Sequence, residues 1–147
     1  MDFQDSMAPW MGRTMKLMDL YFHDTFKKHK FDLSKNQWII LKVLSKEDGK
    51  AQNDLAFITN RDKTSLTRLI SSMEKKNLVA RIPSKKDKRV NHIYLTKNGK
   101  NVLDNTIPIV KKLIDEMQEP LTDKEVANTI AILKRVQDNI LTKIEVA

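Results

Sequence analysis

The chain has 147 residues, which corresponds to one domain or one compact protomer with its own hydrophobic core. It contains no cysteine, which excludes disulfides, thiolate metal centres and thiol-based redox sensing. Its net charge of +8 is concentrated in residues 61–100, where 12 Lys and Arg residues against three acids give +9, while the rest of the chain has −1.

A single basic segment on a neutral body is typical of a polyanion binder, and nucleic acid is favoured over a membrane surface. A solvated charged face is the alternative interpretation, because most charge runs are of that kind. The apolar runs extend over only a few residues and the first residues are acidic, so neither a membrane span nor a secretory signal is expected. We therefore expect a cytoplasmic protein without a membrane partner.

The first 32 residues predict one long amphipathic helix. Between residues 6 and 29, apolar side chains recur mostly at steps of three and four residues, as they do on one face of a helix. These positions are Met7, Trp10, Met11, Met15, Met18, Tyr21, Phe22 and Phe26. Because methionine fills irregular contacts well, we interpret residues 1–32 as part of a dimerisation region.

Two shorter helices are expected next. Ser34, with Gln37 three residues later, is a capping-box start for a helix that ends at residues 48–49. Residues 51–58 predict a short helix, and residues Thr59 and Asn60 supply the turn after it.

The following helix carries the strongest functional signal. Asp62 is expected to cap it, and it runs to Lys76 before Asn77 ends it in the left-handed conformation. Its outer face consists of small hydroxyls and cations, where a helix exposed only to solvent would mix Glu and Lys. This pattern predicts a recognition helix that enters the DNA major groove. The residues expected to contact DNA are Lys63, Thr64, Ser65, Thr67, Arg68 and Ser72.

Residues 81–96 predict a β-hairpin with a charged tip. No glycine occurs between Gly49 and Gly99, so the tip should be a long open loop rather than a tight turn. A basic hairpin directly behind a helix-turn-helix makes the motif winged. The expected DNA-contacting residues of this wing are Lys85, Lys86, Asp87, Lys88 and Arg89.

Each residue of the wing has an expected role. The three lysines would contact phosphates, and Arg89 would enter the flanking minor groove, whose negative potential attracts arginine. Asp87 lies two residues before Arg89, on the same side of an extended chain, and would hold the guanidinium in a bidentate pair.

Two further helices are expected in residues 101–147. Thr96 should cap the first of them, and Pro108 should kink or divide it because proline removes a backbone donor. The last helix should run from Thr122 to about residue 144. Its apolar face is formed by Val126, Ile130, Leu133, Val136, Ile140 and Ile144.

The predicted fold class is therefore mainly α, or α+β. A winged helix-turn-helix DNA-binding domain at residues 33–100 lies between helices from both termini, residues 1–32 and 101–147, that form an all-helical dimerisation region. No enzyme or cofactor is expected, because the sequence has no Ser, His and Asp cluster, glycine-rich phosphate loop or paired-carboxylate motif. No metal site is expected either, because His23 and His29 are six residues apart and His92 is remote.

Three segments of the chain resemble the MarR family of bacterial transcriptional regulators: LSKNQWIILKVL, DLAFI and DKTSLTRLISSMEKKNLVARIPSKKDKRVNHIYLTKNGK. The similarity is close over residues 33–100 and extends to both ends only in helix layout. Its most specific parts are TRLI with MEKKNLVAR, the D-x-R of Asp87 and Arg89, and LTKNG from Leu95. Asn77 replaces the glycine usual in the family, a conservative change because Asn tolerates the same backbone conformation.

The resemblance implies an obligate homodimer, with its first, fifth and sixth helices interlocked, on pseudo-palindromic operators in double-stranded DNA. It also implies release by a small aromatic or anionic ligand. The thiol-oxidation branch of the family is not available to a chain without cysteine. We expect a ligand cleft between the winged core and the helical base, although the same side chains would also serve to pack this junction. The cleft residues are Met18, Tyr21, Phe22 and Trp38.

The expected function is a sequence-specific regulator, more often a repressor than an activator. The alternative is an architectural dimer that coats DNA without a ligand or strong sequence preference, and competition between an operator and random duplex separates the two. A third interpretation, a basic peripheral membrane module, would show binding to anionic vesicles, but the cations lack exposed aromatic neighbours.

Overall fold

The computed structural model describes residues 1–59 and 63–144, and the expected turn residue Asn60 and N-cap Asp62 lie outside the described residues. The chain forms two compact units, Met1–Val110 and Lys111–Ala147. No helix in the described ranges is long and apolar enough to cross a membrane. The elements in chain order are η1 (Phe3–Asp5), α1 (Met7–Lys28), α2 (Lys35–Lys46), β1 (Lys50–Ala51), η2 (Gln52–Thr59), α3 (Lys63–Lys75), β2 (Val79–Pro83), β3 (Asn91–Leu95), α4 (Lys97–Gln118) and α5 (Asp123–Leu141).

The long first helix is present as predicted, but most of it is exposed. Of the residues in α1, only Phe22 and Phe26 are buried. The helix ends where the backbone of Lys30 adopts a positive φ of 60°. The backbone N–H of Phe31 then donates to the carbonyl of Phe26 at 2.9 Å, which satisfies a carbonyl of the last turn.

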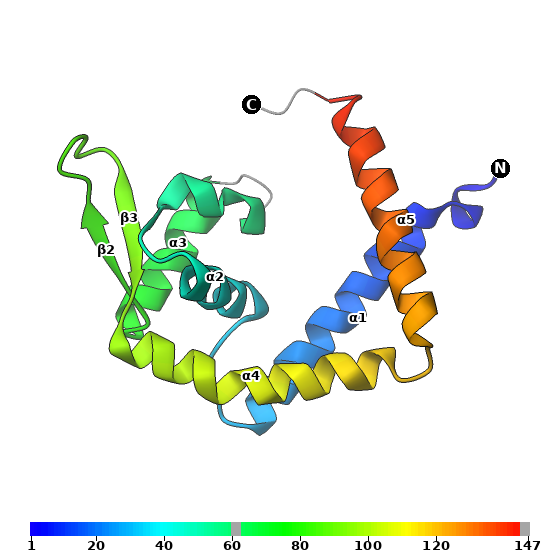
Figure 1. Ribbon diagram of the computed structural model, residues 1–147, viewed down its shortest axis with the longest axis horizontal. Helices are drawn as coiled ribbons and strands as arrows, with labels where there is room; N and C mark the ends of the chain where they lie inside the picture. Colours follow the sequence, from blue (N-terminus) through cyan, green and yellow to red (C-terminus); the bar gives the residue numbers. More distant parts are fainter. Residues whose placement is uncertain (60–62, 145–147) are drawn as a thin grey trace. The chain divides into compact units, whose positions relative to one another are not determined.

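The centre of the winged core is α2, which lies against η2, α3 and β3 (Figure 1). The predicted capping box is confirmed: the Ser34 hydroxyl accepts from the Gln37 backbone N–H, and the Gln37 side chain accepts from the Ser34 backbone N–H. Ile40, Leu41 and Leu44 are almost fully buried, because their spacing places them on one face of the helix.

The region after α2 differs from the expectation of a helix over residues 51–58. Lys50 and Ala51 form the short strand β1, which pairs antiparallel with Ile93 and His92 of β3. A 3₁₀ helix, η2, follows and still places Leu55 in the core. The hairpin is therefore part of a three-stranded sheet with the order β1-β3-β2.

The wing itself is the predicted hairpin with a long tip. In the antiparallel pair β2 and β3, Arg81 lies opposite Ile93. Residues 84–90 form the loop, which is closed by a 2.7 Å hydrogen bond from the Ser84 N–H to the Val90 carbonyl. The hairpin extends past the helices of the winged core (Figure 1).

Pro108 does not divide the helix that contains it, contrary to one of the two expected outcomes. The helix α4 runs without interruption from Lys97 to Gln118. Its start is capped as predicted, because the Thr96 hydroxyl accepts from the Gly99 N–H at 2.9 Å. Fully buried Thr106, two residues before the proline, bonds its hydroxyl to the carbonyls of Val102 and Leu103.

The last helix, α5, is shorter than expected, since it ends at Leu141. Thr122 and Glu125 form its capping box, and the hydrogen bonds from the Thr122 backbone and hydroxyl lower the pKa of the Glu125 carboxyl. No residue of α5 is buried in the single chain. The apolar face predicted for this helix therefore lies exposed or half-exposed.

Candidate DNA-binding surface

The predicted recognition helix α3 divides into a buried and an exposed face. Leu66, Ile70 and Met73 are almost fully buried against the winged core. Five of the six residues predicted to contact DNA are exposed on this helix: Lys63, Thr64, Ser65, Thr67 and Arg68. The helix thus presents hydroxyls and cations outward, as its sequence pattern indicates.

Ser72, the sixth predicted residue, lies apart from that face. Its side chain is half-buried, and its hydroxyl accepts a hydrogen bond from Nε2 of Gln37 at 3.3 Å. Gln37 is itself buried, and its Oε1 accepts from the Lys76 ammonium at 3.0 Å. The hydroxyl of Ser72 is therefore engaged with α2 inside the protein.

Arg81 of β2 links the wing to α3, a role that the sequence did not indicate. Its terminal nitrogen donates to the Ser71 hydroxyl at 3.3 Å and to the Thr67 carbonyl at 3.4 Å. Its Nε lies 3.7 Å from Oε1 of Glu74, which forms an ion pair without a hydrogen bond. The carboxylate nearest the exposed face of α3 is thereby paired with a cation.

Gln52 of η2 orients one of the exposed hydroxyls. Its Nε2 donates to Oγ1 of Thr67 at 3.2 Å. Its Oε1 is buried and has no hydrogen-bond partner among the described residues. Sequence reasoning missed Gln52 because only the fold brings η2 next to the middle of α3.

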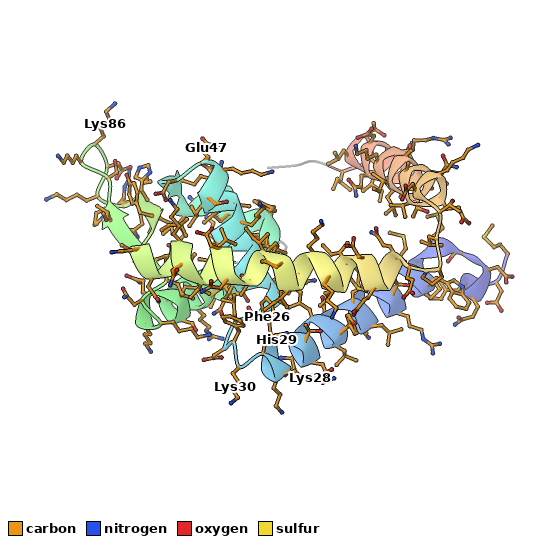
Figure 2. All side chains as sticks on the ribbon, turned by 60° about the horizontal axis from the view of Figure 1, so that its bottom comes forward. Phe26, Lys28, His29, Lys30, Glu47 and Lys86 are labelled. Atoms are coloured by element: carbon orange, nitrogen blue, oxygen red, sulfur yellow. The ribbon has the colours of Figure 1, made fainter. Side chains whose placement is uncertain are left out.

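The wing loop is organised by short-range hydrogen bonds. The Ser84 hydroxyl accepts from the backbone N–H groups of Lys86 and Asp87 at 3.2 and 3.4 Å. The Val90 N–H donates to the Asp87 carbonyl at 3.0 Å. With the backbone held in this way, the side chains of Lys85, Lys86 and Lys88 are exposed, and Lys86 lies at the tip of the hairpin (Figure 2).

Asp87 and Arg89 form the bidentate pair predicted from their spacing. Arg89 donates from Nε to Oδ1 at 3.1 Å and from a terminal nitrogen to Oδ2 at 3.2 Å. The Arg89 backbone N–H also donates to Oδ1, at 3.0 Å. The guanidinium and then the backbone N–H lower the pKa of the Asp87 carboxyl, while the Arg89 side chain stays 91% exposed.

The four residues of the predicted ligand cleft have different surroundings. Phe22 packs edge-on against Trp38, with ring centroids 6.3 Å apart, and the Trp38 indole N–H donates to the Thr106 hydroxyl at 2.9 Å. Met18 and Tyr21 are each 37% exposed on α1. The structure thus uses Phe22 and Trp38 to pack α1 against α2 and α4.

No group of three or more His, Cys, Asp or Glu residues that could hold a metal ion occurs in the part of the chain that the structure describes. The side chains gathered at the exposed surface are hydroxyls and cations instead. Such groups donate hydrogen bonds to phosphates and base edges.

Known proteins similar to this chain are transcriptional regulators. Residues 31–90 match the model of the MarR family. The uncharacterised helix-turn-helix regulator YpoP of Bacillus subtilis is 27% identical over 105 residues, which cover 71% of this chain and 74% of YpoP. The homoprotocatechuate degradative operon repressor of Escherichia coli is 25% identical over 114 residues, which cover 78% of this chain and 76% of the repressor.

Solved structures share the fold. Bordetella bronchiseptica BpsR superposes with a TM-score of 0.83 at 17% identity, covering 94% of this chain and 97% of BpsR. A mutant of Escherichia coli MarR in complex with operator DNA gives a TM-score of 0.80 at 23% identity, covering 88% of this chain and 92% of MarR.

The helix-turn-helix, its basic exposed face and the wing behind it define a winged helix-turn-helix protein. Over residues 31–90 the chain matches the MarR family, and it is similar to DNA-binding transcriptional regulators over most of its length.

Proposed function

We propose that the protein is a homodimeric, sequence-specific transcriptional repressor of the bacterial cytoplasm, which a small aromatic or anionic ligand releases from a pseudo-palindromic operator. The observation that carries this proposal is the guanidinium of Arg89, which Asp87 holds in an exposed position on the wing of the same core that exposes the cations of α3. A carboxylate reduces the positive charge of a DNA-facing loop. The presence of the Asp87 carboxylate is explained if the orientation of the Arg89 side chain contributes more to DNA binding than the net positive charge of the loop.

In the proposed complex, α3 and the wing contact different parts of the DNA. Arg68 and the hydroxyls of α3 contact base edges in the major groove, where each base pair presents a distinct pattern of donors and acceptors. Lys85, Lys86 and Lys88 contact phosphates, and Arg89 enters the adjacent minor groove, where narrow A·T-rich sequence raises the negative potential.

Dimerisation is supported by apolar side chains that each unit leaves exposed on its own helices. Trp10 and Met15 of α1 are 61% and 49% exposed, and Ile130 and Ile140 of α5 are 46% and 48% exposed. Exposed apolar side chains on one face of a helix mark interaction sites, and a second copy covers them through a two-fold contact. Residues 1–32 and 101–147 then form the dimerisation region, and residues 33–100 form the DNA-binding domain.

Ligand release is supported by the relatives. One relative is named as a repressor of the homoprotocatechuate degradative operon, and the DNA binding of BpsR is described as regulated by 6-hydroxynicotinic acid. We propose a cleft for the corresponding ligand at Met18, Tyr21, Phe22 and Trp38. A ligand that favours dimers with mis-spaced recognition helices, with a coupling of about 1 to 3 kcal/mol, weakens operator binding about 5- to 150-fold.

The test is to sequence genomic fragments that the purified protein retains, and then to measure the affinity for the recovered operator against random duplex at several salt concentrations. If a dimer neutralises roughly 6 to 10 phosphates, its affinity falls by about 10³ to 10⁵ between 50 and 200 mM salt. Equal affinity for operator and random duplex would favour the architectural alternative. A nearly flat salt dependence would contradict the proposed DNA-binding surface.

A further inference from the structure

Two neighbouring elements hold the middle of α3 at one exposed residue, Thr67. From η2, Nε2 of Gln52 donates to the Thr67 hydroxyl oxygen at 3.2 Å. From β2, a terminal nitrogen of Arg81 donates to the Thr67 backbone carbonyl at 3.4 Å. Thr67 is nevertheless exposed, on the face of the helix that we expect to contact DNA. Its hydroxyl is therefore held in a defined position at the surface before DNA binds.

The hydrogen bond from Gln52 also limits how the Thr67 hydroxyl can bond further. A hydroxyl has one proton to donate and two lone pairs that accept. In Thr67 one lone pair is used by the Gln52 amide, and no acceptor for the proton is present among the described residues. An acceptor on the DNA would use this proton, whereas a donor on the DNA would leave the proton unpaired.

Gln52 is an unfavourable residue at this position if its side chain serves only to pack η2. Its Oε1 is buried and has no hydrogen-bond partner among the described residues. A buried acceptor without a partner destabilises the folded state, and an apolar side chain of the same length would avoid that cost. The presence of an amide is explained if its N–H group has a role at Thr67.

Gln52 also lies beside the wing. Together with Asn53 it lines a small hollow of about 70 Å³, whose other lining residues are Arg89, Val90 and Asn91. Asn53 is exposed, so a charge placed there and a charge placed at Gln52 both lie near the proposed DNA-binding surface. Asn53 thus provides a matched control for changes of charge at Gln52.

We propose that Gln52 is a positioning residue that sets the base preference of the recognition helix through Thr67. By donating to the Thr67 hydroxyl, Gln52 directs the hydroxyl proton toward an acceptor on the edge of a base. In the major groove guanine offers the acceptors O6 and N7, whereas cytosine offers its N4 amino donor. Thr67 accordingly favours guanine over cytosine at one position of each half-site. This inference rests on the proposed function, because it requires Thr67 to face the bases.

The test is to measure binding of the full-length protein to libraries of the recovered operator, randomised at each position. Gln52→Met removes the amide and keeps the length of the side chain. It should reduce the preference for guanine over cytosine at one position by about 2- to 10-fold and leave the other positions unchanged. Its melting temperature should be unchanged or higher, because the unpaired buried acceptor is removed with the amide. An unchanged preference, or an equal loss of affinity for every sequence, would overturn the role of Gln52.

Gln52→Glu tests the polarity of the contact. A carboxylate accepts the Thr67 proton, so the hydroxyl then presents only its lone pairs to the DNA. The preferred base should shift from guanine toward cytosine. Asn53→Asp adds the same charge and should lower the overall affinity without changing this preference. A preference for guanine that persists in Gln52→Glu would overturn the proposed polarity, and an equal shift in both variants would show that charge alone alters recognition.

Thr67→Val removes the hydroxyl and keeps the shape of the side chain. It should lose the same preference as Gln52→Met, and the double variant should lose no more, because the two residues act through one contact. Additive losses would overturn the positioning role. A wild-type protein that does not distinguish operator from random duplex would refute the proposed function together with this inference. A wild-type protein that distinguishes them while Gln52→Met keeps the same base profile would refute this inference alone.

Discussion

At the scale of single residues, we expect the pair of Asp87 and Arg89 to serve DNA binding through its geometry rather than through a contribution to folding stability. Exposed ion pairs contribute little to folding, and the Arg89 side chain is 91% exposed. Two parallel hydrogen bonds nevertheless fix the plane of the guanidinium before DNA arrives. This preorganisation reduces the side-chain entropy lost on binding, which is how a rigid donor increases affinity.

The pKa of Asp87 sets the pH range of this pair. Because Arg89 lowers the pKa of the carboxyl in the folded protein, the pair is fully formed above the ordinary aspartate value of about 3.9. It is lost only as the pH falls through the lower folded-state value. Titration of Asp87 therefore contributes nothing to the pH dependence of DNA binding near neutrality.

Asp87→Ala should weaken operator binding even though it raises the net charge by one, because Arg89 loses its fixed direction. Asp24→Ala removes an exposed acid from α1 and serves as the charge-matched control, for which no weakening is expected. Fluorescence anisotropy with a labelled operator measures both. Tighter binding by Asp87→Ala would show that charge outweighs orientation.

Replacing Arg89 and replacing Arg68 by alanine should affect operator recognition in different ways. Arg89→Ala should weaken binding broadly and alter the preference for A·T-rich flanks, whereas Arg68→Ala should relax the choice of one base in each half-site by about 1 to 3 kcal/mol. Binding to libraries randomised at each operator position distinguishes these patterns. The same profile for both variants would contradict the division between shape and base-edge recognition.

At the scale of secondary structure, features specified by neighbouring residues were predictable. The capping box predicted at Ser34 is a four-residue pattern and is present, and the last helix begins after Thr122 as predicted, with a capping box of the same kind. The strand β1 was missed because it is two residues long and exists only through its pairing with β3. Arg81 was missed for the same reason, since its partners on α3 are 7, 10 and 14 residues away in sequence.

Ser72 illustrates the limit of a helical pattern for locating a binding face. The period of a helix assigns each residue a direction but does not state how far the neighbouring helix reaches. Buried Gln37 of α2 extends to the Ser72 hydroxyl, so a residue predicted to face outward is bonded inward. Pro108 shows that a local signal can also be overruled. Proline lacks a backbone donor and was expected to kink or divide the helix, but α4 continues through it.

The two glycines within α1 and α4 give a test of how tightly the elements pack. A Cβ atom on Gly99 would lie 2.0 Å from the Leu78 carbonyl oxygen, whereas nothing lies within 4 Å of one on Gly12. Gly99→Ala should therefore destabilise the fold by about 1 to 3 kcal/mol through overpacking. Gly12→Ala should stabilise it by roughly 0.5 to 1 kcal/mol through helix propensity. Urea denaturation measures both, and unchanged stability of Gly99→Ala would contradict the close approach of α4 to Leu78.

At the scale of the whole molecule, the distribution of charge and apolar surface supports the two interfaces that we propose, one with DNA and one with a second copy. The basic residues of α3 and the wing are exposed on the winged core, while α1 and α5 each expose apolar side chains on their own. If a two-fold axis joins two copies through the terminal helices, the two recognition helices face half-sites about one helical turn apart, roughly 34 to 36 Å. The two-fold contact between the terminal helices then gives the protein its symmetry, and the two half-sites of the operator follow the same symmetry.

A charge placed on the apolar face of α5 tests this arrangement. Ile130 is 46% exposed in the single chain, so a monomeric protein would tolerate Ile130→Glu with little loss of stability. In the proposed dimer the same carboxylate is buried without a partner, which dissociates or unfolds the protein. Asn128→Glu adds an identical charge on the opposite side of the helix and should leave the dimer intact. Light scattering coupled to gel filtration gives the mass of each variant.

Deleting residues 126–147 removes most of α5 and should leave aggregated or unfolded protein, because the apolar surface of the remaining chain stays uncovered. Ile130→Glu distinguishes loss of assembly from loss of folding. Helical circular dichroism with a monomeric mass would show a folded protomer that no longer associates, and its operator affinity should fall because it engages one half-site at a time. A monomeric variant that binds the complete operator as tightly as wild type would overturn the two-fold arrangement.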